Sequence, residues 1–224
     1  MFGPCIMLCD LRTTSRWSSP VPPRGRLTGP GKPCNLDVLV RLLKRGERSA
    51  GAHVAIREIV KYGDSRLVAK NETVKVFDDP GFAALIQDMK ETCWAAPGLG
   101  LAAPQIGVNL RVAIVDLSIG KDPSQVLVLV NPVVVDAQGL IRDEEGCLSL
   151  PDLVETVARP EKVTVEAFDE RGNRRALDGR GLLARALCHE VDHLDQRLFV
   201  DRLSSLKKGL VLRQVVKRQK KGAW

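Results

Sequence analysis

The sequence has few aromatic residues, few histidines and no long apolar run. Phe, Trp and Tyr make up 4% of the 224 residues, so a core has to be built mainly from aliphatic side chains. No apolar run approaches the roughly 18 to 20 residues of a membrane-spanning helix, so such a helix is not predicted. The six cysteines show no short repeated spacing and no secretory signal pattern accompanies them, which argues against a disulfide framework. In a reducing compartment these thiols are free for metal binding or nucleophilic chemistry.

The net charge of +7 is concentrated at the two ends of the chain. Residues 1–36 carry five basic residues and one acid, a balance of +4, and residues 203–224 carry seven basic residues and no acid. The body between them therefore carries −4. An acidic body with few aromatics argues against a nucleic-acid-binding protein in spite of a pI near 9.3, although the basic C-terminal segment could contact phosphate.

Residues 1–50 are predicted to be a poorly structured extension. They contain five prolines between Pro20 and Pro33 and no sustained hydrophobic periodicity, except that residues 37–49 could form a short amphipathic helix. The arginine- and serine-rich, acid-poor composition of residues 1–36 also fits an organelle transit peptide. A disordered extension and a start codon assigned too far upstream are the plainer alternatives.

The pattern of the remaining chain predicts an α+β fold. Asp79 suits a helix N-cap and Pro80 suits the first helical position, and apolar residues follow at helical spacing as far as Cys93. Short links between the strand-like runs favour antiparallel pairing, because parallel strands need a long crossover. The valine- and isoleucine-rich runs that predict strands are 111–117, 126–135 and 162–168, and two further helices are expected over about 181–194 and 203–219.

The most specific local pattern is the pair of histidines in His189-Glu190-Val191-Asp192-His193. Positions i and i+4 of a helix lie on one face, so both imidazoles can reach one metal ion. Glu190 would lie beside the ion without being a ligand, free to take a proton from bound water. The alternative is two unrelated helical histidines, but two of the only three histidines in the chain fall in this pattern. Metal binding is the stronger interpretation.

The residues leave the third metal ligand open. Catalytic sites of this kind usually have three protein ligands, and common zinc peptidases place the third downstream as Glu or His. Here no Glu follows Glu190 and no His follows His193. Cys188 should point about 100° away from its neighbour His189, Cys93 lies on a core-like helical face, and Cys147 lies between a turn and a proline. The candidates are Asp195 and Asp201 near the helix end, and His53, Cys93, Cys147 and Cys188 upstream.

A glycine-rich segment, 98–107, is the second unusual pattern. It lacks the Lys-Ser/Thr of a phosphate-binding P-loop and is followed by a strand-like run, so a phosphate site is not favoured. Its small residues would let the main chain approach a ligand closely. Gln105 is its one polar side chain, and the amide could donate to a developing oxyanion. Composition alone favours the plainer interpretation of a tight buried loop with a surface glutamine.

Three segments, in this order, resemble the peptide deformylase family. They are a Gly-x-Gly-x-Ala-Ala-x-Gln loop at 98–105, a Glu-Gly-Cys-Leu-Ser segment at 145–149 and a His-Glu-x-Asp-His-Leu helix at 189–194, and the resemblance looks continuous from about residue 55 to 204. It implies an α+β fold with mixed or antiparallel sheets around the central helix that carries the histidine motif. The expected organisation is an extension over 1–50, a catalytic domain over 51–204 and a basic helix or tail over 205–224.

The resemblance also implies a function and a set of site residues. The function is metal-dependent removal of the N-formyl group from the N-terminal methionine of newly synthesised proteins, with release of formate. The metal would be one divalent ion, Fe²⁺, which Zn²⁺ or Ni²⁺ can replace. The expected ligands are Cys147, His189 and His193, the acid/base is Glu190, the oxyanion hole is the Gln105 amide with the Leu148 N–H, and the substrate-binding residues are Gly98, Leu99 and Gly100.

The implied partners are nascent formyl-Met chains and the ribosome, the latter through the basic C-terminal segment, with no membrane. The implied location is the bacterial cytoplasm, or an organelle if residues 1–36 are a transit peptide.

Three positions depart from the family's pattern: Gln196, where glycine is common, Cys188, where glutamine is frequent, and Val154, where some members carry an arginine that contacts substrate. These departures leave substrate-side detail open and touch neither a ligand nor Glu190.

Two rival interpretations are weaker. A generic zinc peptidase would need the downstream ligand that is missing. An inactive metal-binding or ribosome-associated module would be expected to have lost Glu190, Gln105 or a ligand, and all are present.

Overall fold

The computed structural model describes residues 55–222, so the predicted extension over 1–50 and the helix expected at 37–49 lie outside the described residues. The helices are α2 (Pro80–Ala95), α3 (Leu182–Leu194) and α4 (Ser205–Lys220), with short 3-10 helices η1 (Ser65–Leu67), η2 (Ala103–Ile106), η3 (Pro123–Gln125) and η4 (Phe199–Arg202). The strands are β1 (Gly100–Ala102), β2 (Val112–Val115), β3 (Leu127–Gln138), β4 (Ile141–Cys147), β5 (Leu150–Arg159), β6 (Lys162–Phe168) and β7 (Arg174–Arg180).

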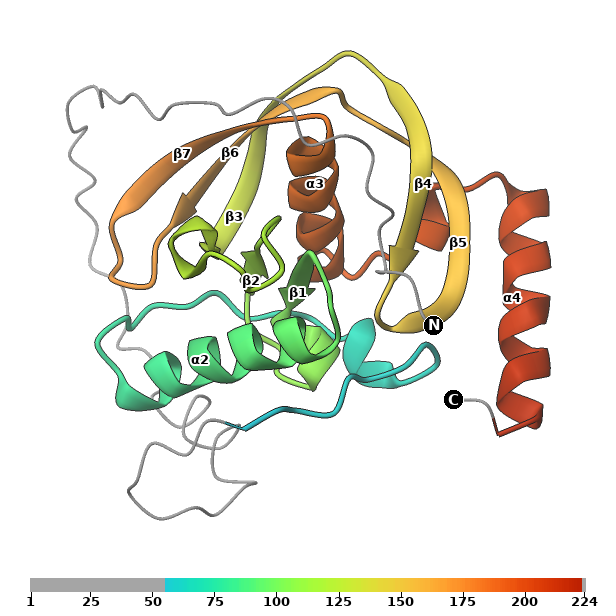
Figure 1. The fold of residues 1–224 in the computed structure, drawn as a ribbon, viewed down its shortest axis with the longest axis horizontal. Helices are drawn as coiled ribbons and strands as arrows, with labels where there is room; N and C mark the ends of the chain where they lie inside the picture. Colours follow the sequence, from blue (N-terminus) through green and yellow to red (C-terminus); the bar gives the residue numbers. More distant parts are fainter. Residues whose placement is uncertain (1–54, 223–224) are drawn as a thin grey trace. The chain divides into compact units, whose positions relative to one another are not determined.

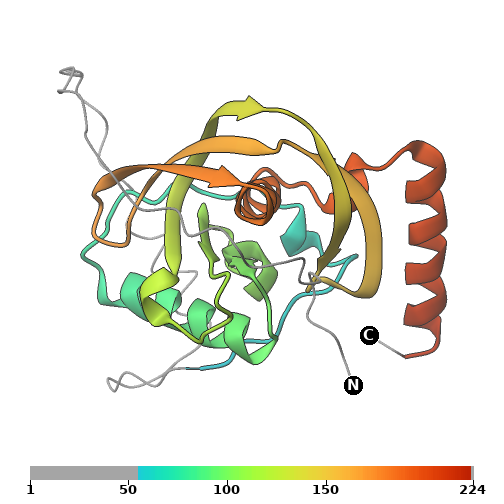
Figure 2. The same ribbon diagram turned by 45° about the horizontal axis from the view of Figure 1, so that its top comes forward.

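The described strands form two sheets. One has five strands in the order β1-β2-β3-β6-β7, and the other is the β4-β5 hairpin. Every pair of neighbouring strands is antiparallel, as the short links predict. Helix α3 lies between the two sheets (Figure 1), and a view nearly along its axis shows strands on several sides of it (Figure 2). The α+β prediction with a central motif helix is therefore confirmed.

Helix α2 forms where the sequence predicts it. The Asp79 side chain caps the helix by accepting a hydrogen bond from the Phe82 N–H at 3.0 Å, and Pro80 occupies the first turn. Phe82, Met89 and Cys93 are buried, which confirms the predicted apolar face. The apolar face of the helix therefore packs into the core, beside strand β1 of the glycine-rich segment.

Three of the seven described strands overlap the predicted runs, and four were not predicted: the three-residue β1 and the longer strands β4, β5 and β7. β2, β3 and β6 overlap the valine-rich runs. β4, β5 and β7 were missed because charged residues interrupt their alternation, as in Arg142-Asp143-Glu144 of β4, which is exposed. These strands form because a partner strand satisfies their main chain: β4 pairs with β5 from Ile141 opposite Arg159 to Cys147 opposite Leu150.

Helix α3 is buried along nearly its whole length. All residues from Ala184 to Leu194 are buried, because the helix packs against the five-stranded sheet on one side and faces the hairpin on the other. Leu187 and Leu194 belong to the core cluster that the large sheet shares with this helix. Both histidines of the motif therefore lie in the interior.

Helix α4 confirms the expected C-terminal helix and packs against the β4-β5 hairpin. Ser204 caps it, and Val211 and Val215 are buried in a second cluster with residues of β5 such as Leu153. Leu206, in contrast, is 76% exposed. The helix lies along the outer side of β5 (Figures 1 and 2). Across the described residues, no helix is both long enough and apolar enough to cross a bilayer.

Candidate metal centre and active site

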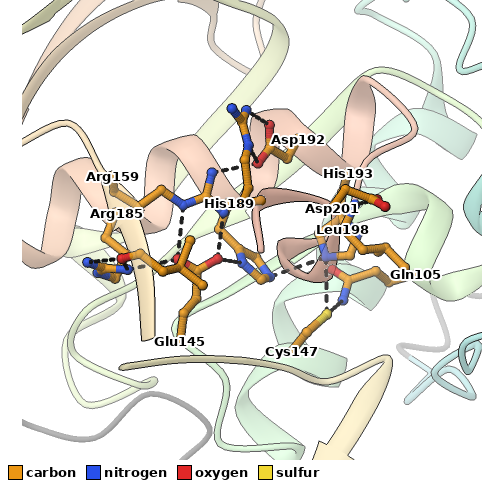
Figure 3. A network of polar contacts seen from close by, with 12 residues as sticks. Gln105, Glu145, Cys147, Arg159, Arg185, His189, Asp192, His193, Leu198 and Asp201 are labelled. Carbon is orange, nitrogen blue, oxygen red and sulfur yellow. Dashed lines mark hydrogen bonds and ion pairs between the residues drawn. The ribbon is translucent and has the colours of Figure 1, made fainter. Parts of the chain in front are cut away.

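Two elements bring three potential metal ligands together in the interior. His189 and His193 lie one turn apart on α3, and Cys147 is the last residue of β4. The His193 Nε2 atom lies 3.2 Å from Cys147 Sγ and 3.3 Å from His189 Nε2. All three ligand atoms lie within 4.8 Å of one another, and all three residues are buried (Figure 3).

The donor set fits a divalent metal ion. A thiolate and two imidazoles are soft to borderline ligands that suit Fe²⁺ or Zn²⁺, and three protein ligands leave one position open for water or substrate. A buried polar atom near the cluster also indicates an ion: Glu190 Oε2 has no hydrogen-bond partner among the described residues. Buried polar atoms without a partner call for an explanation, and an ion with its water supplies one.

The other candidate ligands within the described residues do not reach the histidine pair. Asp195 pairs with Arg111 and Asp201 pairs with Lys208, and neither belongs to the cluster of Cys147, His189 and His193. Cys93 Sγ lies 3.3 Å from the carbonyl of Gly98. Cys188 is buried, but it is not part of the three-residue cluster. His53 lies outside the described residues.

A buried carboxylate fixes the orientation of His189. Glu145 Oε1 lies 2.7 Å from His189 Nδ1, which places the proton on Nδ1 and turns the Nε2 lone pair toward Cys147. Glu145 is itself held by Arg159, which donates from Nε at 2.9 Å and from a terminal nitrogen at 2.5 Å. Arg185 donates to the same carboxylate at 3.0 Å. The His189 imidazole is therefore held in one orientation by Glu145, which two buried arginines hold in turn.

A chain of charged side chains continues from Arg159 toward the surface. Arg159 also donates to Asp192 at 2.5 Å, and Asp192 accepts from Arg202, which is partly exposed. Burial alone would raise the pKa of Glu145, but hydrogen bonds from Arg159 and His189 lower it well below its ordinary value. The carboxylate therefore stays ionised, as a partner for the His189 N–H must.

Glu190 follows the potential ligand His189 on α3 and is buried. It is 3% exposed. Burial raises the pKa of this carboxyl from 4.5 to about 7 in the protein without metal. A group that titrates near neutral pH can both accept and return a proton, which is the property of a general acid/base.

Gln105 is buried, not on the surface, so the plainer interpretation of this residue is wrong. It is 1% exposed and lies in η2. Its Oε1 accepts from the Ala102 N–H at 2.8 Å, which fixes the amide so that Nε2 faces the metal cluster. Nε2 lies 3.3 Å from Ser149 Oγ and 3.5 Å from Cys147 Sγ. The amide therefore offers an oriented donor beside the ligands.

The remaining predicted site residues border the same cluster. Leu148 lies in the two-residue turn between β4 and β5, directly after Cys147. A Cβ atom on Gly98 would come within 2.9 Å of Leu148 Cδ1, so the glycine-rich loop and the hairpin turn touch. Gly98 and Leu99 are buried, and Gly100 begins β1, the edge strand of the large sheet.

Sequence reasoning missed the residues that support the ligands. Glu145 lies in the Glu-Gly-Cys-Leu-Ser segment, but the sequence predicts no role for it, nor for Arg159, Arg185 and Asp192. A charged residue in a strand usually faces solvent, so the sequence carried no sign that Arg159 would be 1% exposed. The only available signal was the position of Asp192 within the histidine motif.

Comparisons with known proteins agree on one family. The sequence model of the family described as Polypeptide deformylase matches residues 56–209. The chain is 48% identical over 169 residues to a peptide deformylase of Acidobacterium capsulatum, covering 75% of this chain and 99% of that protein. It is 45% identical over 157 residues to one of Thermodesulfovibrio yellowstonii, covering 70% and 94%.

Solved structures give the same result. The crystal structure of a peptide deformylase from Legionella pneumophila aligns with a TM-score of 0.70 and 44% identity, covering 75% of this chain and 98% of that one. A plant peptide deformylase PDF1B aligns with a TM-score of 0.69 and 32% identity, covering 74% and 90%.

Proposed function

Because this chain belongs to the peptide deformylase family, we propose a role in that family's reaction for each residue of its buried site. The chain is a metal-dependent hydrolase that removes the N-formyl group from nascent peptides. The observation that carries the residue assignment is the convergence of Cys147, His189 and His193 beside the buried Glu190.

Cys147, His189 and His193 hold a single divalent metal ion in this proposal, and the ion is Fe²⁺, with Zn²⁺ or Ni²⁺ able to replace it. A thiolate ligand donates more charge than a carboxylate, which suits such ions. When bound, the metal supplies Lewis-acid chemistry and lowers the pKa of water. Glu145 keeps His189 in the ligating tautomer, since it lies 2.7 Å from Nδ1.

Glu190 moves the proton. It accepts a proton from the attacking water as the oxygen of that water bonds to the formyl carbon. When the bond between the formyl carbon and the methionine nitrogen breaks, Glu190 returns the proton to that nitrogen, so that formate and a free amine leave. The raised pKa of Glu190, about 7, supports both halves of this transfer.

The Gln105 amide and the Leu148 N–H stabilise the oxygen that becomes negative as water adds. The argument for Gln105 is its fixed orientation, because Ala102 occupies its Oε1 and leaves Nε2 as the donor. The argument for Leu148 is its place directly after the ligand Cys147.

The substrate lies along Gly98, Leu99 and Gly100. Since β1 is an edge strand, an extended peptide could add to its outer side by main-chain hydrogen bonds. Glycines at two of these positions let the substrate backbone come close, and Gly100 brings it next to Glu190.

We further propose that residues 51–204 act as the catalytic domain, preceded by an extension over 1–50 and followed by a basic segment over 205–224. The basic segment contacts ribosomal RNA, so that the enzyme meets emerging chains. Within the described residues, Arg213, Lys217, Lys220 and Lys221 are exposed and form no ion pair, whereas Lys207, Lys208 and Arg218 pair with acids of the body. The bacterial relatives support a cytoplasmic location, with an organelle as the alternative if residues 1–36 are a transit peptide.

The direct test is formate release from a formyl-Met peptide by protein purified without oxygen, together with metal analysis. We expect turnover and about one bound iron per chain. Cys147→Ser should lose metal, and Cys188→Ser is the matched control that should keep it. Equal metal content in wild type and Cys147→Ser would place the third ligand elsewhere.

The ribosome contact is tested by replacing the exposed basic residues Arg213, Lys217, Lys220 and Lys221 with glutamine. Co-sedimentation with ribosomes should weaken, most clearly at low salt, because fewer counterions are released. Hydrolysis of a short formyl peptide should stay unchanged. The matched control replaces Lys207 and Lys208, which pair with Glu155 and Asp201. Equal co-sedimentation at every salt concentration would exclude the contact.

A further inference from the structure

A short segment outside the three motifs is hydrogen-bonded to both loops of the proposed oxyanion hole. The Val60 N–H donates to the main-chain oxygen of Gln105 at 2.7 Å, and the Tyr62 N–H donates to that of Ser149 at 2.9 Å. Between them, the Lys61 ammonium donates to the main-chain oxygen of Leu148 at 3.0 Å. Three consecutive residues therefore span the two loops.

The two loops belong to different sheets, so something has to fix their relative position. Gln105 lies in η2, between the first two strands of the large sheet, and Leu148 lies in the turn of the β4-β5 hairpin. Donors to one oxygen have to be placed to a fraction of an ångström, and a shift of about 1 Å can cost about 100-fold in rate. The segment at 60–62 supplies three of the hydrogen bonds that hold the loops together.

Among the described residues of this segment, only Lys61 forms a hydrogen bond to one of the two loops through its side chain. It is half-buried, and no carboxylate within residues 55–222 forms an ion pair with it. Its charge-assisted hydrogen bond is stronger than one between neutral groups and restrains the Leu148–Ser149 peptide, which is joined through the Leu148 Cα to the peptide that carries the Leu148 N–H. A positive charge at this place also favours the negative charge that develops on the oxygen held by the neighbouring donors.

We infer that Lys61 is a positioning residue for the hydrolysis, holding the Leu148 carbonyl so that the Leu148 N–H and the Gln105 amide converge on the same oxygen. The inference rests on the proposed roles of Gln105 and Leu148. It predicts an effect on the transition state and not on ground-state binding of substrate, so kcat falls while KM is unchanged.

The test replaces Lys61 by methionine, which keeps most of the aliphatic length and removes the donor and the charge. Lys61→Met should lower kcat at least about 10-fold with KM within about twofold of wild type, a loss below the roughly 100-fold of deleting an oxyanion donor outright. Metal content and melting temperature should match wild type. Lys61→Arg should recover most of the rate. Lys70→Met is the matched control, since Lys70 is 80% exposed and pairs only with Glu72.

A parallel Gln105→Ala variant separates failure of the inference from failure of the proposed function. If Gln105→Ala loses about 100-fold in kcat and Lys61→Met loses nothing, Lys61 has no positioning role and the oxyanion hole stands. If Gln105→Ala keeps full activity, the proposed role of Gln105 is wrong, and the inference about Lys61, which rests on it, is wrong as well. A raised KM with unchanged kcat in Lys61→Met would overturn the inference, because Lys61 would then bind substrate. Lost metal, or no recovery with arginine, would overturn it in favour of a general packing role.

Discussion

Gly100 lies directly against the carboxylate of Glu190. A Cβ atom built on Gly100 would stand 2.9 Å from Cδ of Glu190 and closer still to Oε1. Gly100 pairs with Val115 in the sheet, so its main chain cannot easily retreat. Glu190, the proposed acid/base, thus occupies space that any side chain at position 100 would take.

Gly100→Ala should therefore displace Glu190 and lower turnover by about 10- to 100-fold, because small misplacements of a catalytic group are costly. Metal content should not change, since the atoms nearest to a Cβ at this position all belong to Glu190 and none to a proposed ligand. Gly209→Ala is the control, because nothing lies within 4 Å of a Cβ there. Steady-state kinetics with a formyl-Met peptide measures the effect, and wild-type kcat in Gly100→Ala would mean that the carboxylate has room to move.

Glu190→Gln should keep the metal and lose about 100- to 10,000-fold in kcat, since the amide fills the same space but cannot accept the proton. Glu190→Ala should behave in the same way. Formate release and metal content are measured on the same samples of wild type and both variants. Substantial residual hydrolysis by either variant would remove Glu190 from its proposed role.

The raised pKa of Glu190 also predicts a pH dependence of stability in the metal-free protein. The folded protein holds this proton up to a pKa of about 7, whereas the unfolded chain releases it near 4.5. The folded state therefore binds more protons between these values, and this group's contribution to stability falls by about 3 kcal/mol as pH rises from 4.5 to 7. Denaturant unfolding of wild type and Glu190→Gln should show the variant gaining relative stability over this window. A difference that is flat with pH would contradict the prediction.

Arg159→Leu should destabilise the fold by about 3 to 5 kcal/mol, because it leaves Glu145 and Asp192 as buried charges without this partner. Metal affinity should also fall by about 10- to 100-fold, since Glu145 orients His189. The control is Arg174→Leu, where a 69% exposed arginine pairs with Glu166 and the cost should stay below about 1 kcal/mol. Denaturant titration and metal competition measure the two effects; an Arg159→Leu protein as stable as the control would show that the network is not needed.

Val215→Ala should destabilise the protein by about 2 kcal/mol, because Val215 is 1% exposed and packs helix α4 onto β5. Val216, its neighbour, is 49% exposed, so Val216→Ala should cost much less. Equal melting temperatures for the two variants would indicate that α4 is only loosely attached. This burial also means that deleting residues 205–224 should lower stability, which makes charge substitution the cleaner test of the ribosome contact.

The sequence predicted the elements that carry their own periodicity. Helix α2 has its cap and apolar face within one stretch of chain, and β6 has the valine alternation of a half-buried strand. The hairpin β4-β5 was missed because its signal lies in the pairing of two strands. Residues as polar as Arg142 and Glu144 extend only because β5 runs alongside them.

The sequence by itself determined the reaction chemistry, because the spacing of His189, Glu190 and His193 on one helix face is a local property. Residue chemistry alone left the third ligand open and made Gln105 look like a surface residue, whereas the resemblance to the family already pointed to Cys147 and to the Gln105 amide. Only the tertiary structure brings Cys147 to the histidines, because the hairpin packs across α3, and only the folded loop buries and orients the Gln105 amide. The buried support of Glu145 and Arg159 and the contact of Lys61 with Leu148 join residues 14 and 87 positions apart. Such contacts depend on the free energy of the whole packed core, so no local pattern of residues encodes them.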